Sequence, residues 1–169
     1  WIKRAEMFRL VGSAFQEPWL FAGTLRDNIT FGQERCSDEW AITCLKMAGA
    51  NFIGDGSLSS LDQFMQDRGG NLSGGQKQSV MIARALAASA PICLFDEPTS
   101  AMDGQTENIV IENLKQYLHD KTAFIITHKP KLVSLCDRVI ILEQGRVVLD
   151  TTTEAYLSAL RAKGNKSEQ

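Results

Sequence analysis

Two short stretches of the chain carry groups that could handle a phosphate-containing ligand. The first is Asn71-Leu72-Ser73-Gly74-Gly75-Gln76-Lys77-Gln78. Its spacing predicts the start of a helix, because Ser73 is a good N-cap residue and Gln76, three positions later, completes a capping box. Gly74 and Gly75 leave the first turn without side chains. The unpaired N–H groups of that turn and the helix dipole therefore favour an anion.

The second stretch, Ile92-Cys93-Leu94-Phe95-Asp96-Glu97-Pro98, is an apolar run that ends in two carboxylates. An apolar run without alternation predicts a strand buried in a parallel sheet. Ligands of open parallel sheets bind at the carboxyl ends of the strands. Asp96 and Glu97 could therefore serve a phosphate-bound metal ion and an attacking water. Either stretch alone could be an ordinary helix start or loop entrance, but their order and spacing together favour a functional site.

Together, the two stretches resemble the signature motif and the Walker B motif of ABC-transporter ATPase domains. The resemblance rests on Leu72–Gln76 and on Phe95-Asp96-Glu97-Pro98-Thr99-Ser100. It implies that Asp96 holds Mg²⁺ and that Glu97 is the general base that activates the hydrolytic water. It also implies four nucleotide-binding residues in the signature motif, which are Ser73, Gly74, Gly75 and Gln76.

Three further residues gain a role from the same resemblance. Gln16 is similar to the Q-loop glutamine, whose amide oxygen contacts Mg²⁺ and the attacking water. His128 follows the apolar stretch Ala123–Thr127 and is similar to the switch histidine, which stabilises charge that develops on the γ-phosphate. Thr99-Ser100-Ala101-Met102-Asp103 resembles the D-loop that crosses a dimer interface. This resemblance makes Asp103 another candidate nucleotide-binding residue.

The elements that must position these residues follow from apolar periodicity, caps and turn residues. Besides Ile92–Asp96, strands are expected at Met7–Gly12, Ala123–Thr127, Arg138–Leu142 and Val147–Leu149. Helices are expected at Ser37–Gly49, Gly74–Ala88, Gly104–His119, Lys131–Cys136 and Thr153–Ala162. The first of these helices should bury a stripe formed by Trp40, Thr43, Cys44 and Met47. The strands around Ile125 and Ile140 show no polar alternation and are expected to be buried on both faces.

The predicted fold class is α/β, a P-loop NTPase-like parallel-sheet core of the ABC ATPase type with a helical signature subdomain. A phosphate-binding G-x-x-x-x-G-K-[ST] loop occurs nowhere in the 169 residues. The family carries that loop on its first core strand, so we expect the N-terminal part of the domain to be absent. The expected division is 1–16 for the end of the N-terminal core and the Q-loop, 17–89 for the helical subdomain with the signature motif, 90–160 for the catalytic core and 161–169 for a mobile tail.

Composition and charge exclude several other classes of protein. Hydrophobic residues make up 44% of the chain and charged residues 22%, as in an ordinary globular domain. The net charge of −2 and the lack of a basic tract give no indication of a nucleic-acid partner. The four cysteines form no C-x-x-C pair, which argues against a zinc site and favours a reducing compartment. No apolar run approaches the ~20 residues that span a bilayer, and the N-terminus does not resemble a signal peptide.

The resemblance implies ATP and Mg²⁺ as cofactors, and two protein partners. One is a second nucleotide-binding domain that closes head to tail, and the other is the transmembrane domain of an exporter. The stretch Phe15–Ile29 looks most like bacterial ATPases of type I protein secretion, which implies the cytoplasmic side of the inner membrane. Gln66–Gly70 lies where exporters carry a loop that touches the transmembrane domain, with Gln66-Asp67 in place of the family's Gly-Glu. The implied function is ATP hydrolysis that powers export, with this chain alone inactive.

Two other functions remain open at this point. A chromosome-maintenance or repair ATPase of the same superfamily would also carry both motifs. Such a protein would show long heptad repeats between Gln16 and Leu72, and this chain has none there. A catalytically silent ABC module that acts as a scaffold is the other alternative. Degenerate sites usually lose one catalytic residue, and Glu97 and His128 are both present. The transported substrate cannot be read from this sequence.

Overall fold

The computed structural model describes residues 6, 9–31, 33, 36–54 and 56–164. The chain forms two compact units, Trp1–Ile126 and Thr127–Gln169. The first unit contains β1 (Val11–Ala14), β2 (Gly23–Thr24), α2 (Leu25–Thr30), α3 (Asp38–Met47), η1 (Leu58–Asp62), β3 (Phe64–Met65), η2 (Asp67–Gly69), α4 (Gly74–Ala87), β4 (Ile92–Asp96), α5 (Gly104–Tyr117) and β5 (Thr122–Ile126). The second contains α6 (Pro130–Val133), β6 (Arg138–Glu143), β7 (Arg146–Thr152) and α7 (Thr153–Gly164).

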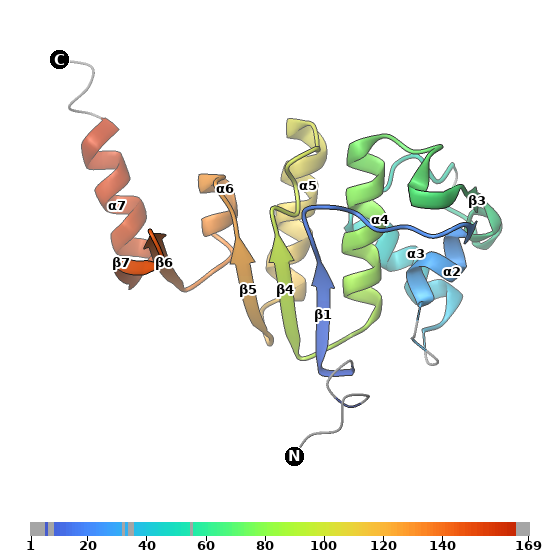
Figure 1. Cartoon of the computed structure of the whole chain (residues 1–169), viewed down its shortest axis with the longest axis horizontal. Helices are drawn as coiled ribbons and strands as arrows, with labels where there is room; N and C mark the ends of the chain where they lie inside the picture. The colour runs from blue at the N-terminus through green and yellow to red at the C-terminus, as the bar shows by residue number, and fades with distance from the viewer. Residues whose placement is uncertain (1–5, 7–8, 32, 34–35, 55, 165–169) are drawn as a thin grey trace. The chain divides into compact units, whose positions relative to one another are not determined.

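A three-stranded parallel sheet forms the centre of the first unit, as the fold prediction requires. Its order is β1-β4-β5, and Figure 1 shows the carboxylate strand β4 in the middle. Ala14 pairs with Phe95, and Phe95 pairs with Ile125 on the other side. Cys93 and Phe95 on β4 are buried. All three strands therefore end at the same edge of the sheet, where the candidate catalytic residues follow.

Helix α4 packs directly against β1, and a glycine on β1 makes this possible. A Cβ atom added at Gly12 would lie only 2.5 Å from the carbonyl oxygen of Ala85 on α4. Helices α2 and α3 contact α4 in turn, on the side away from the sheet (Figure 1). Helix α4 is thus the layer between the sheet and helices α2 and α3.

The apolar residues of α4 are buried, as predicted from their types and spacing. The five predicted core residues of this helix are Val80, Met81, Ala83, Ala85 and Leu86. On α5 the predicted apolar face is also confirmed, with Val110 and Leu114 fully buried. Asp103 caps the first turn of α5 through its side chain. Both helices end within two residues of the expected positions.

The predicted stripe on α3 is only partly confirmed: Cys44 is buried, and Trp40 and Met47 are half-buried. The buried residues are Ala41, Ile42, Cys44 and Leu45, whereas Thr43 is exposed. The buried face is therefore shifted toward Ile42 and Leu45, two large apolar side chains that the predicted stripe left out. The N-cap prediction is confirmed, because the Ser37 hydroxyl accepts a hydrogen bond from the Trp40 N–H at 3.2 Å.

Two strand predictions also need correction. The strand expected at Met7–Gly12 is confirmed only at Val11 and Gly12, where β1 begins, because Arg9 and Leu10 are helical. Met7 and Phe8 lie outside the described residues. β5 is not buried on both faces, since Phe124 is 58% exposed and Ile126 is 59% exposed. In the described part of the chain, β5 pairs only with β4. The face of β5 that carries Phe124 and Ile126 is not covered by any other described element of the first unit.

The second unit is built on the antiparallel pair β6 and β7. The two strands are joined by a two-residue turn: Gln144 and Gly145 both have positive φ, as a type I′ turn requires. Ile140 and Leu142 are exposed, against the prediction of burial on both faces. The helix predicted at Lys131–Cys136 is the shorter α6, which begins at Pro130 and ends at Val133. In residues 134–136, each backbone N–H donates to the carbonyl oxygen three residues earlier and no longer to the one four residues earlier.

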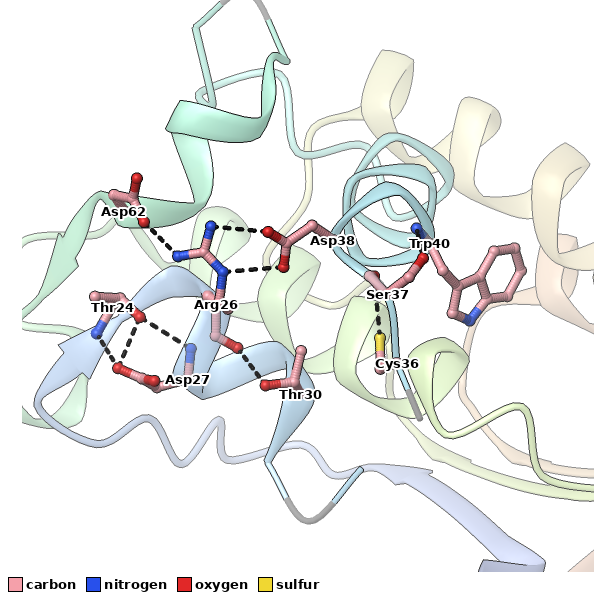
Figure 2. A network of polar contacts seen from close by, with 9 residues as sticks. All are labelled: Thr24, Arg26, Asp27, Thr30, Cys36, Ser37, Asp38, Trp40 and Asp62. Carbon is pink, nitrogen blue, oxygen red and sulfur yellow. Dashed lines mark hydrogen bonds and ion pairs between the residues drawn. The ribbon is translucent and has the colours of Figure 1, made fainter. Parts of the chain in front are cut away.

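An arginine holds three elements of the helical subdomain together. Figure 2 shows the Arg26 guanidinium between Asp38 and Asp62. Two bonds of 3.0 Å join it to the two carboxylate oxygens of Asp38 at the start of α3. A further bond joins it to Asp62 at the end of η1. These hydrogen bonds raise the pKa of Arg26, chiefly through Asp38, and lower the pKa of Asp38.

No helix in the described residues is long and apolar enough to span a bilayer.

Candidate nucleotide site

Three of the predicted site residues leave the sheet at its carboxyl edge. Asp96 is the last residue of β4, and Glu97 follows it directly. Gln16 follows the end of β1 by two residues, and β1 pairs with β4 in parallel. Glu97 is buried, Asp96 is half-buried and Gln16 is exposed. The structure thus confirms the sheet edge that was expected to carry these three side chains.

Glu97 has a backbone conformation that is unusual for a glutamate. Its φ is +45°, in the left-handed region. Such a conformation is kept only where the surroundings determine it, and it is concentrated at functional sites. Here the Glu97 N–H donates to the carbonyl oxygen of Ile126 at 2.9 Å. The Glu97 carbonyl oxygen accepts from the Ser100 N–H at 3.2 Å and from the Gln78 side chain at 3.3 Å.

The start of α4 has the predicted capping box. The Ser73 hydroxyl accepts from the Gln76 N–H at 3.3 Å, and the Gln76 side-chain oxygen accepts from the Ser73 N–H at 2.8 Å. Gly74 and Gly75 occupy the next two positions, for whose N–H groups the helix itself has no acceptor. These two donors make the turn suitable for an anionic oxygen.

An open hollow of about 610 Å³ lies over this turn. Its walls come from four segments: the start of α4 with the signature turn, the D-loop, the first turn of α5 and the loop after α3. The lining residues are Gly49, Asn51, Phe52, Ser73, Gly74, Gly75, Gln76, Ser79, Ala101, Met102, Asp103 and Thr106. A Cβ atom at Gly75 would lie 2.9 Å from the backbone oxygen of Ala101, so glycine is needed for this close approach. The hollow therefore joins two motifs that lie apart in the sequence.

Asp103 has a clear local role. Its Oδ1 accepts from the N–H groups of Gln105 and Thr106, each at 3.0 Å, and its Oδ2 accepts from the Thr106 hydroxyl at 2.7 Å. The backbone and hydroxyl hydrogen bonds from Thr106 hold the pKa of Asp103 below its usual value. The carboxylate is therefore ionised and caps α5. A contact of Asp103 with nucleotide stays a prediction.

The described residues contain no preformed cluster of metal ligands. No group of three or more His, Cys, Asp or Glu side chains in the described residues could hold one. Mg²⁺ does not need such a group, since it commonly binds through one or two carboxylates together with substrate phosphates and water. A single half-buried carboxylate such as Asp96, at the edge of a parallel sheet, fits that requirement.

His128 lies two residues after β5 and belongs to the second unit. Its position relative to Glu97 stays a prediction.

Sequence reasoning gave no role to three residues that hold the site in place. Gln78 is 4% exposed, and its side chain bonds the segment after Glu97. Asn28 is fully buried, and Arg84 donates to both of its oxygens. One signal was available for Arg84, because it is the only charged residue among the apolar residues in the second half of α4. Gln78 and Asn28 lie in polar or mixed stretches that give no such signal.

Comparisons with known proteins agree with the motifs. A family model described as ABC transporter matches residues 2–100. "ABC transporter B family member 1" of Dictyostelium discoideum is 36% identical over 138 residues, which cover 82% of this chain and 15% of that protein. "Multidrug resistance protein 1" of Entamoeba histolytica is 40% identical over 141 residues, which cover 82% and 11%. "Beta-(1-->2)glucan export ATP-binding/permease protein NdvA" of Rhizobium meliloti is 36% identical over 171 positions, which cover 96% and 29%.

A solved structure, a bacterial Atm1-family ABC exporter with ATP bound, has the same fold. Its TM-score is 0.84 and its sequence identity 30%, with 94% of this chain and 28% of that chain covered. The chain thus spans between 11% and 29% of the length of the relatives named above.

Proposed function

Because the chain belongs to the ABC transporter family, we propose that it forms part of a nucleotide-binding domain that hydrolyses ATP to drive export by a longer membrane protein. The observation that carries the proposal is the hollow at the start of α4. There the signature turn and the D-loop meet, with Gly75 against Ala101. Names of relatives that include "export" and "multidrug resistance" support the exporter branch.

In this proposal the signature turn binds the γ-phosphate of an ATP molecule held by a second nucleotide-binding domain. The N–H groups of Gly74 and Gly75 and the hydroxyl of Ser73 supply the donors. The Ser73 hydroxyl and the N–H groups of Gly74 and Gly75 lie at an open hollow, which could receive the phosphates of that ATP molecule. Two domains closing head to tail would each complete the site of the other.

The carboxyl edge of the sheet performs the chemistry. Glu97 takes a proton from the attacking water as general base. Asp96 would hold Mg²⁺, which would supply neutralisation of the charge on the phosphate oxygens. Gln16 would help to hold the metal ion and the attacking water, and His128 would stabilise the charge that develops on the γ-phosphate. Asp103 and Gln76 contribute to the nucleotide site from the D-loop and the signature turn.

The partners of the chain follow from the same proposal. One is a second nucleotide-binding domain, and the other is a transmembrane domain that would place this chain at the cytoplasmic side of the membrane. Two neighbouring side chains, Trp19 and Arg68, suit a docking site for the transmembrane domain. Trp19 is exposed, and the Arg68 guanidinium lies 5.6 Å from the centre of its ring. The backbone N–H of Arg68 donates to the Leu20 carbonyl oxygen at 2.9 Å, which keeps the two segments together. A role in type I protein secretion stays a prediction.

The test compares two variants in the full-length protein that contains this chain. Glu97→Gln should bind ATP but stall hydrolysis, so that a closed dimer accumulates. Ser73→Arg should prevent closure, because a long cationic side chain would fill the anion-binding turn. Gel filtration with ATP and phosphate release are measured for both. Equal amounts of dimer in the two variants would show that the assigned roles are wrong, and hydrolysis at the normal rate by Glu97→Gln would contradict the general base.

The isolated 169-residue chain should not hydrolyse ATP at a measurable rate. Phosphoryl transfer depends almost entirely on positioning and on neutralisation of phosphate charge. Both would rest largely on the phosphate-binding loop, which these residues lack. Phosphate release from the purified chain, dependent on Mg²⁺ and abolished by Glu97→Gln, would contradict this prediction.

A further inference from the structure

The side chain of Gln78 links the signature helix to the segment that follows the Walker B strand. Gln78 is in the second turn of α4 and is 4% exposed. Its Nε2 donates to the Ser100 hydroxyl at 2.6 Å and to the Glu97 carbonyl oxygen at 3.3 Å. Its Oε1 accepts from the Ala101 N–H at 2.9 Å. One buried amide thus bonds three residues of a single five-residue segment.

These bonds act on the backbone of Glu97 itself. The left-handed φ of +45° at Glu97 turns the chain sharply after β4. Its carbonyl oxygen is fixed by two donors, the Ser100 N–H and Gln78 Nε2, and its N–H is fixed by Ile126. Of these three bonds, the one from Gln78 comes from outside the sheet and the turn. The direction in which the Glu97 side chain leaves the backbone therefore depends partly on α4.

The same amide sets the position of the D-loop against the signature turn. Ala101, whose N–H is held by Gln78, is the residue that approaches Gly74 and Gly75 most closely. Gly75 and Ala101 both line the hollow. Loss of the Gln78 side chain would free the D-loop wall of the hollow as well as the turn at Glu97.

We propose that Gln78 is a positioning residue for ATP hydrolysis, which sets both the backbone conformation of Glu97 and the D-loop wall of the nucleotide hollow. This inference rests on the proposed function, since it assumes that Glu97 acts on the hydrolytic water. Gln78 does not touch the nucleotide and acts through its two loop contacts. An amide is suited to this role because it supplies a donor and an acceptor at the same time.

The test measures steady-state ATP hydrolysis in the full-length protein for Gln78→Met, which keeps the length of the side chain and removes its polar groups. We expect kcat to fall by ~10- to 100-fold, the size of effect that small misplacements of catalytic groups produce. KM for ATP should stay within about two-fold, because the variant keeps the contacts that bind the nucleotide equally in the ground state and the transition state. Ser100→Ala, at an exposed position, should give a smaller fall in kcat. The double variant should lose less than the product of the two single effects, because both variants break the same hydrogen bond.

Gln116→Met is the matched control, since it makes the same chemical change at an exposed position of α5. It should leave kcat unchanged. Wild-type kcat in a folded Gln78→Met variant would overturn the inference. If Gln78→Met does not fold, Ser100→Ala decides: a lower kcat with unchanged KM supports the inference, and an unchanged kcat overturns it. Glu97→Gln is measured in parallel, and full activity in that variant would instead contradict the proposed function.

Discussion

Arg84 on α4 donates hydrogen bonds to both oxygens of Asn28, a residue 56 positions earlier in the chain. The distances are 2.6 Å to the Asn28 carbonyl oxygen and 3.0 Å to its Oδ1. A third bond of 2.9 Å reaches the Trp19 carbonyl oxygen. Asn28 also bonds the N–H and the carbonyl oxygen of Phe21. The signature helix therefore holds the segment that follows Gln16.

Replacement of Arg84 by methionine should destabilise the chain strongly. Burial lowers the pKa of Arg84 to about 10, so the guanidinium is still charged at pH 7. We expect the free energy of unfolding to fall by about 2–4 kcal/mol, because oxygens of Asn28 and Trp19 lose a charged donor in a partly buried site. Urea unfolding measures the change. Arg161→Met, at an exposed position on α7, is the control. A loss no larger than that of the control would contradict the prediction.

The cluster around Arg26 should respond to salt, unlike the Arg84 network. Arg26 is bonded to Asp38 and Asp62, and both carboxylates are partly or fully exposed. Exposed ion pairs contribute little to stability and are screened by added salt. We expect Arg26→Met to lower the melting temperature less than Arg84→Met does. The difference from wild type should shrink further in high salt. An effect of Arg26→Met that is as large as that of Arg84→Met and independent of salt would contradict this.

The buried thiol of Cys44 predicts a loss of stability at alkaline pH. Burial, with a smaller contribution from Cys36, raises the pKa of Cys44 from 9.0 to about 12. The unfolded chain therefore releases this proton more easily than the folded one. The stabilising difference is fully present below pH 9 and is lost as the pH rises toward 12. Melting temperatures between pH 8 and 10.5 should fall more steeply for wild type than for Cys44→Ala. Parallel curves would contradict the prediction.

The exposed side of β5 predicts self-association of the isolated chain. Strand edges with unpaired backbone groups are templates for further strands. β5 has a strand partner on one side only in the described residues, and it exposes Phe124 and Ile126. We expect a dimer in light scattering that Phe124→Lys weakens. Leu58→Lys, at an exposed apolar position outside the sheet, should leave it unchanged. A clean monomer of the wild-type chain at all concentrations would contradict the prediction.

Local signals made much of the site predictable. The capping box at Ser73 depends on a spacing of three residues, and the end of β4 at Asp96 depends on one apolar run. Both are visible in a few neighbouring residues. The helix start at Ser73 and the strand end at Asp96 were therefore predicted correctly, and the roles of these residues at a site stay predictions.

The contacts that hold the site could not be predicted, because they join distant residues. Nothing around Asn28 indicates that its partner is Arg84, and nothing around Gln78 indicates Ala101. The error on α3 has a different cause. Several apolar faces are compatible with its sequence, and only the packing against α4 selects the one that contains Ile42 and Leu45.

The close approach of α4 to the D-loop has a consequence for second-site suppression. At Gly75 the obstructing atom is the backbone oxygen of Ala101, so no change of side chain at position 101 could relieve a substitution there. At Gly74 the nearest atom is the Cβ of Ala101, at 3.3 Å, which Ala101→Gly would remove. Selection for restored activity should therefore find a suppressor at position 101 for Gly74→Ala and none there for Gly75→Ala. Two adjacent glycines of one motif would thus differ in their genetic interactions, although the sequence alone makes them look equivalent.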